Sequence, residues 1–163
     1  MTRLRNSLLV GAVLICVGCG DKGAKEFREY AKVESAIGLV ANASAFERGP
    51  RLEQLEKIAV TSARVQGLKQ SCLLAYQSFA EASSLLESAR QHTAKVEAEV
   101  KILRARKEAG GSLSEAEEQR VLEMSKSAAD SLKSVTKALD AAEVKVAACQ
   151  AKRQALRHLM ENR

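Results

Sequence analysis

Two cysteines, Cys72 and Cys149, are the residues of this 163-residue chain best placed to react with each other. They lie at equal distances from the pair Gly110–Gly111, so a chain folded back at these glycines brings the two thiols level. We therefore predict a disulfide bond within a long antiparallel helical hairpin. The alternative is a redox-active pair, but the cysteines lack the close spacing of thiol oxidoreductases.

The hairpin can be tested within the sequence, because antiparallel pairing fixes which residue faces which. Alternating steps of three and four residues from the cysteines give the layers Ala75–Val146, Phe79–Ala142, Ala82–Leu139, Leu86–Val135, Ala89–Leu132, Thr93–Ala128, Val96–Ser125 and Val100–Val121. A large side chain mostly faces a small one, which keeps the volume of each layer nearly constant. The alternative is two Ala-rich helices that match by chance. The pattern favours a coiled-coil-like hairpin with an Ala-rich seam.

The composition is typical of a single all-helical domain, with 46% hydrophobic residues, 3% aromatic residues and one proline. A stripe at three- and four-residue steps predicts a shorter N-terminal helix over 25–48, formed by Phe27, Tyr30, Val33, Ile37, Val40 and Ser44. We expect Gly49–Pro50 to end this helix and to open the next.

The hairpin itself is predicted to occupy residues 50–163. Its first helix, about 50–108, should end at Gly110–Gly111, because glycine permits the left-handed cap that closes a helix. Ser114 and Glu117 have capping-box spacing, so the second helix should run over about 114–162.

The amino terminus combines Arg3 and Arg5, an apolar run over 8–17, and Gly18–Cys19. The run is shorter than the roughly 20 residues that span a bilayer. This order of parts resembles the signal peptides of bacterial lipoproteins. The resemblance implies that residues 1–18 are a signal peptide and that Cys19 is acylated, with palmitate among its lipids. An ordinary cleaved signal and a cytosolic protein with a buried apolar start are the alternatives.

The resemblance also implies a compartment. A lipoprotein of this kind faces the periplasm of the bacterial envelope, where disulfides persist. Asp directly after the acylated cysteine is the strongest inner-membrane signal of the family, and here Gly20 stands there with Asp21 one step later, so the outer membrane is favoured. Cys16 would leave with the signal peptide, and residues 19–24 would form a flexible tether.

The formal charge of +6 is mild, because Arg3 and Arg5 lie in the leader and leave 24 of the 26 basic residues against 20 acidic ones. Interleaved charges and few aromatic residues argue against nucleic-acid binding. One group of cations falls at the open end of the hairpin, opposite Gly110–Gly111, and could contact an anionic surface: Arg51, Lys57, Arg64, Lys69, Lys152, Arg153, Arg157 and Arg163. The alternative is that cations near a helix end complement its dipole.

The sequence contains no set of residues with the spacing of a known catalytic site. The register places His92 level with Ala129 and His158 level with Ala63, tens of ångströms apart at about 1.5 Å per residue. We therefore expect no enzyme activity, no metal and no cofactor.

The sequence predicts a lipid-anchored helical interaction or scaffold module that contacts another envelope protein. Alternatives are binding of anionic lipid, lipopolysaccharide or cell-wall polymer through the basic open end, and a lipoprotein of the exclusion or immunity type. The N-terminal helix either folds back on the hairpin, with the anchor beside its middle, or continues away from it. The sequence leaves the oligomeric state open.

Overall fold

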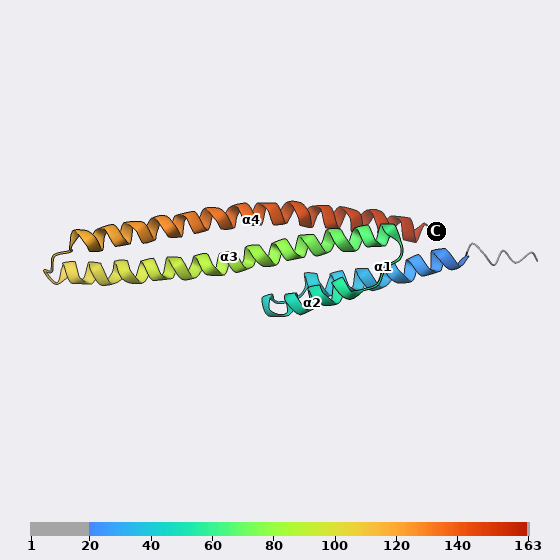
Figure 1. Ribbon diagram of the computed structural model, residues 1–163, viewed down its shortest axis with the longest axis horizontal. Coiled ribbons are helices and arrows are strands. Elements are labelled where there is room, and N and C mark those ends of the chain that lie inside the picture. The colour runs from blue at the N-terminus through green and yellow to red at the C-terminus, as the bar shows by residue number, and fades with distance from the viewer. Residues whose placement is uncertain (1–19, 163) are drawn as a thin grey trace, which may run out of the picture.

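The computed structural model describes residues 20–162, and in that range the chain forms four helices and no strand. They are α1 (Gly20–Ala41), α2 (Ala45–Lys57), α3 (Ala63–Glu108) and α4 (Glu115–Glu161). Helices α3 and α4 form a long antiparallel hairpin, and α1 and α2 lie against the first part of α3 (Figure 1). The predicted all-α hairpin with a shorter N-terminal helix packed on it is confirmed.

The tip of the hairpin is built as its glycines predict. Gly110 has a φ of 82°, a conformation that side chains with a Cβ rarely adopt. The amide of Gly111 donates to the carbonyl of Arg106, and the amide of Gly110 donates to that of Lys107, which together make a Schellman cap. Ser114 and Glu117 form the predicted capping box at the start of α4.

The predicted register of the hairpin is also confirmed. The disulfide joins Cys72 to Cys149 with a Cα–Cα distance of 4.8 Å. Lys145 Nζ donates to Ser78 Oγ at 2.6 Å, within two residues of the facing position that the cysteines assign. The buried seam residues are mostly the small members of the predicted layers, Ala75, Ala82, Ala89, Ala128 and Ala142. The hairpin therefore packs by close approach of its helix axes.

The predicted helix over 50–108 was wrong at its start, because residues 58–62 are not helical and separate α2 from α3. Ile58, Val60 and Thr61 are β-branched and lower helix propensity, and Ser62 caps α3 by accepting from the amide of Val65. Pro50 opens no helix and lies inside α2, which Ser44 caps. Pro50 is exposed, so the carbonyl that loses its partner there can be hydrated.

The start of the first helix also differs from its prediction. Residues 20–24, expected to be a flexible tether, are the first turns of α1, and this helix ends at Ala41 rather than at residue 48. Because α2 turns the chain back before α3 begins, α1 runs in the same direction as α3 (Figure 1). Gly20 therefore lies at the open end of the hairpin, not beside its middle as the folded-back arrangement predicted.

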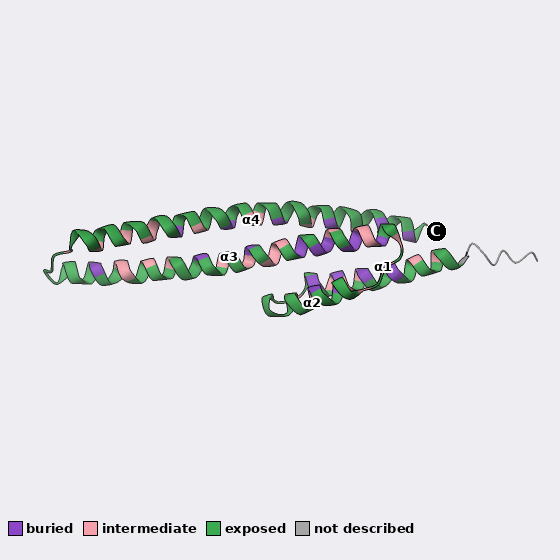
Figure 2. Ribbon diagram, viewed as in Figure 1, coloured by how far each residue is buried: buried purple, intermediate pink, exposed green. Residues whose placement is uncertain are grey.

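The main core lies where all four helices meet. Tyr30, Val33, Ile37 and Val40 of the predicted stripe are buried, whereas Phe27 is half-exposed and Ser44 is the cap of α2. Purple segments gather on α1 and on the first part of α3, and the far part of the hairpin is mostly green (Figure 2). We call residues 20–79 with 142–162 the base, and residues 80–141 the arm.

None of the helices within residues 20–162 has the length and apolar character needed to cross a membrane.

Candidate functional site

The predicted basic group at the open end does not form one free surface. Lys69 is buried, and its ammonium donates to the carbonyls of Glu56 at 3.1 Å and Ile58 at 2.9 Å. It therefore satisfies the carboxyl end of α2, where helix carbonyls have no intrahelical partner. The prediction that Lys69 could touch an anionic surface is wrong, because its ammonium group is buried and donates to backbone carbonyls within the fold.

Two more of these cations hold α1 against α4. Arg153 donates to both carboxylate oxygens of Glu34, at 3.0 and 2.5 Å, and Arg157 donates to one of them at 3.0 Å. The Arg153 hydrogen bond is the main reason that the pKa of Glu34 lies below its usual range; partial burial opposes it, and Arg157 adds to the lowering. This cluster binds the N-terminal helix to the C-terminal one.

The remaining members of the basic group differ in their surroundings. Lys57 pairs with Glu53 at 3.7 Å, and Arg51 donates to Gln54 at 3.1 Å. Arg64 and Lys152 are exposed and make no ion pair with any residue in the range 20–162. Arg163 lies outside the described residues.

Replacing Glu34 with glutamine is expected to lower the free energy of unfolding by about 1–2 kcal/mol at neutral pH, because charge-assisted bonds to two guanidinium groups are lost. The depressed pKa means that the folded protein binds a proton at Glu34 more weakly than the unfolded chain. Wild-type stability from this site is therefore full above about pH 5 and is lost as pH falls through the ordinary carboxyl range into the lower folded pKa.

Urea unfolding from pH 7 to pH 3 checks this prediction. The gap between wild type and Glu34→Gln should narrow as the pH falls. Glu53→Gln is the matched control, because Glu53 and Lys57 are both exposed and such pairs contribute little. A gap that stays constant over the whole pH range would contradict the role given to Glu34.

Sequence reasoning missed the residues that fix the start of α3. Glu29 Oε2 accepts from the amides of Thr61 at 3.0 Å and Ser62 at 2.9 Å, and its Oε1 accepts from Thr61 Oγ1 at 2.6 Å. The Thr61 hydroxyl is the main reason that the pKa of Glu29 is lowered. Glu26 accepts from Ser62 Oγ at 2.8 Å. The only sequence signal was Ser62, an N-cap residue type after a β-branched run.

The two cysteines are fully buried in the base, among the core side chains of α1, α3 and α4. Their bond is therefore a structural pin. The other predicted cysteine site, lipid attachment at Cys19, lies outside the described residues.

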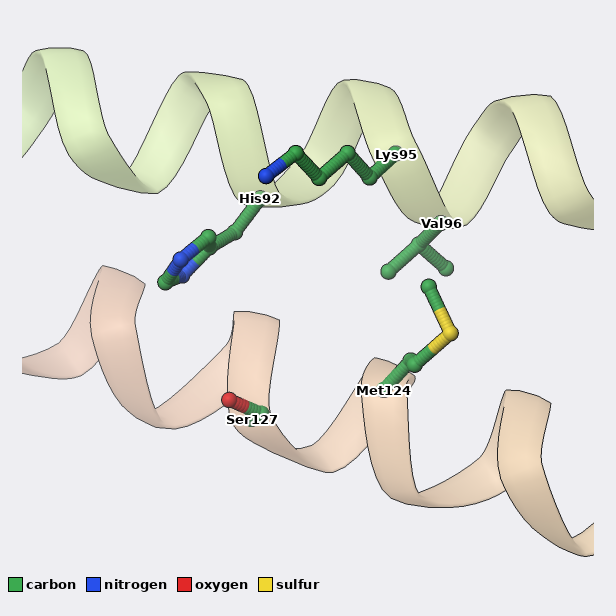
Figure 3. A pocket seen from close by; sticks show the side chains of 5 residues that line it. All are labelled: His92, Lys95, Val96, Met124 and Ser127. Carbon is green, nitrogen blue, oxygen red and sulfur yellow. The ribbon is translucent and has the colours of Figure 1, made fainter.

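A small hollow lies beside His92, one of the two histidines of the sequence. This hollow of about 120 Å³ lies between the two helices of the arm. His92, Lys95 and Val96 from α3 face Met124 and Ser127 from α4 (Figure 3). The imidazole Nδ1 lies 3.4 Å from the hydroxyl of Ser131. No group of three potential metal ligands occurs within residues 20–162. The hollow therefore combines mainly apolar walls with the polar groups of His92, Lys95 and Ser127.

A larger apolar hollow lies at the far end of the arm. It has a volume of about 330 Å³, apolar walls from Val100, Leu103, Leu113 and Val121, and a charged rim of Arg104, Lys107 and Glu118. Ile102 and Leu122, on the same part of the arm, are about half exposed but do not line this hollow. Arg106 and Glu117 form an ion pair that joins the two helices beside the tip. Apolar walls with a charged rim are typical of a surface that binds another protein.

The base and the arm together define a class of protein: a disulfide-pinned helical hairpin whose open end is filled by an N-terminal helix pair and whose arm projects alone. No protein-family model, curated protein or solved structure matches the chain.

Proposed function

We propose that this chain is a lipid-anchored, periplasm-facing helical interaction module of the bacterial envelope, without enzymatic activity, that presents its arm to another envelope protein. The proposal of a lipid anchor is based on the lipoprotein-like leader and Cys19, and the outer membrane is the membrane that it favours. The proposed interaction role is based on the arm, the part of the hairpin that α1 and α2 do not cover.

The arm supports this role because the disulfide in the base fixes its register, while apolar side chains on its surface remain exposed. Its seam is only partly buried and its register is pinned from the base, and several large side chains along it stay exposed, including Leu85, Ile102, Leu122 and Leu132. Single exposed apolar side chains also occur in the base, among them Phe46, so the feature that distinguishes the arm is the apolar hollow at its far end. A helical partner that packs against the end of the arm would bury the walls of this hollow, which stabilises a contact by about 25 cal/mol per Å² of apolar area removed from water.

In-cell crosslinking tests the proposal. A photoreactive residue at Ile102 or Leu122 should give one discrete adduct with another envelope protein, and the same residue at Gln154 in the base should give none. An adduct pattern that is equal at both ends would contradict the assignment of the partner surface to the arm.

A charge substitution gives the same test a matched control. Leu122→Asp should reduce recovery of the partner at least tenfold, because an aspartate in an apolar contact must be desolvated. Leu39→Asp should leave recovery unchanged, because Leu39 lies in the base and has the same 49% exposure as Leu122. Equal thermal unfolding of the two variants would show that folding is not the cause.

The alternative proposal, that binding of anionic lipid or wall polymer by the basic open end is itself the function in place of a protein contact of the arm, has weaker support. Arg64 and Lys152 remain available for it, whereas Lys69, Arg153 and Arg157 are engaged within the fold. Binding of this kind should fall steeply with added salt, whereas an apolar contact of the arm should not.

A further inference from the structure

The position of the first turn of α1 restricts how the protein can sit on a membrane. Helix α1 is already helical at Gly20, directly after Cys19, and the apolar run of the leader ends only two residues earlier, at Val17. Attachment through an acylated Cys19 or through a retained apolar run therefore meets the fold at the same point, the first turn of α1.

That point lies at the open end of the hairpin. Helix α1 runs alongside α3 in the same direction, and its first turns extend beyond the start of α3 and the end of α4 (Figure 1). The hairpin tip at Gly110–Gly111 is at the opposite end of the molecule. The 46 residues of α3 separate the two ends by about 70 Å at 1.5 Å per residue.

Helix α1 is held in this direction by contacts from Glu26 to Val40. Near its start, Glu26 and Glu29 hold Ser62 and Thr61 at the beginning of α3. In its middle, Glu34 holds Arg153 of α4. Tyr30, Val33, Ile37 and Val40 are buried between these polar contacts. A swing of α1 away from the hairpin would break all of them together, so the direction of α1 sets the direction of the rod.

The chemistry of the open end suits a bilayer surface. Lys22, Lys25 and Arg64 are exposed there, and each cation near an anionic membrane adds about 1 kcal/mol of attraction. Glu26 and Glu29 lie at the same end but turn inward to the start of α3. Phe27 is half-exposed on α1, and apolar rings on an otherwise polar helix face are typical of interfacial helices. Asp21 and Glu161 offset part of the positive charge.

We propose that the open end of the bundle, marked by Lys22, Lys25, Phe27 and Arg64, is the surface that rests on the phospholipid headgroups. The rod then stands away from the bilayer and holds the tip of the arm at its farthest point, about 70 Å beyond the start of α3. This inference rests on the membrane attachment in the proposed function. It adds that the partner of the arm is met far from the membrane that carries the protein.

Energy transfer to labelled headgroups tests the orientation. The full chain, purified from membranes, would carry a genetically encoded azide at Ala63 in the base, Ser84 at the start of the arm or Ser112 at the tip. All three residues are exposed, and azide coupling of the donor fluorophore avoids the cysteines. In vesicles with acceptor-labelled headgroups, transfer should be strongest from position 63, intermediate from 84, and several-fold weaker from 112.

Equal transfer from the three positions would mean that the rod lies flat and would overturn the proposal, as would stronger transfer from the tip than from the base. Intact mass tests the anchor separately, because an unacylated Cys19 would contradict the proposed lipid attachment. In that case a chain beginning at Cys19 and coupled there to a maleimide lipid still measures the orientation. The crosslinking result at Ile102 or Leu122 depends on neither measurement.

Discussion

Replacing Cys72 and Cys149 together with alanine is expected to lower the free energy of unfolding by about 4 kcal/mol, and the melting temperature by on the order of 10 °C. The bond closes a loop of 77 residues, so its removal gives the unfolded chain much more conformational freedom. The effect should be large here because the Ala-rich seam of the arm buries little apolar area per residue and resists sliding only weakly.

Urea unfolding without reductant measures this difference. Alanine is the suitable replacement, because both cysteines are fully buried and a serine hydroxyl would add an unpaired polar group. Wild-type protein unfolded in the presence of reductant should approach the midpoint of the double variant. Equal midpoints for wild type and variant without reductant would show that helix packing alone holds the register.

Truncating Ile37 to alanine is expected to cost about 2–5 kcal/mol, the range typical of a large aliphatic side chain removed from a packed core. Ile37 is fully buried at the junction of α1 with the hairpin, next to Val33 and Val40. The cavity would weaken the attachment of α1 as well as the whole fold. Thermal unfolding measures the overall loss of stability. A larger increase in hydrogen exchange over wild type in α1 than in α4 would show that the loss is greatest in α1.

Leu39→Ala is the matched control for this prediction. Leu39 lies on the same helix two residues away and is half-exposed, so its truncation should change stability by no more than about 0.5 kcal/mol. Similar losses for the two variants would mean that α1 does not pack in the orientation described.

The hairpin was predictable from one sequence because several independent signals agree on it. Cys72 and Cys149 define a register, Gly110–Gly111 marks the turn midway between them, and large and small side chains alternate across the seam in that same register. The structure buries Ala82 and Ala142 where this pattern places them. Leu132 is the partial exception, since it faces the buried Ala89 but remains about half exposed.

The base was harder to predict because its helix boundaries depend on contacts between distant residues. Gly49–Pro50 was the stronger local signal, yet the chain turns at residues 42–44 and again at 58–62. Glu29 caps α3 from a distance of more than 30 residues, and Lys69 caps the end of α2 from within α3. No local pattern announces such caps. Counting charges could not foresee such contacts either. It therefore assigned Lys69 and Arg153 to a free surface, whereas both make hydrogen bonds within the fold.

The parallel course of α1 and α3 has a mechanical consequence. A pull between a membrane anchor before Gly20 and a partner at Gly110–Gly111 acts in opposite directions on two helices that lie side by side. Such a load shears the contacts of α1 with α3 and α4, so the buried side chains of α1 and the Glu34–Arg153 pair resist it together. An antiparallel α1 would instead be peeled away one turn at a time. Resistance to such forced unfolding is set by the unfolding rate, so loss of these contacts should raise that rate under load.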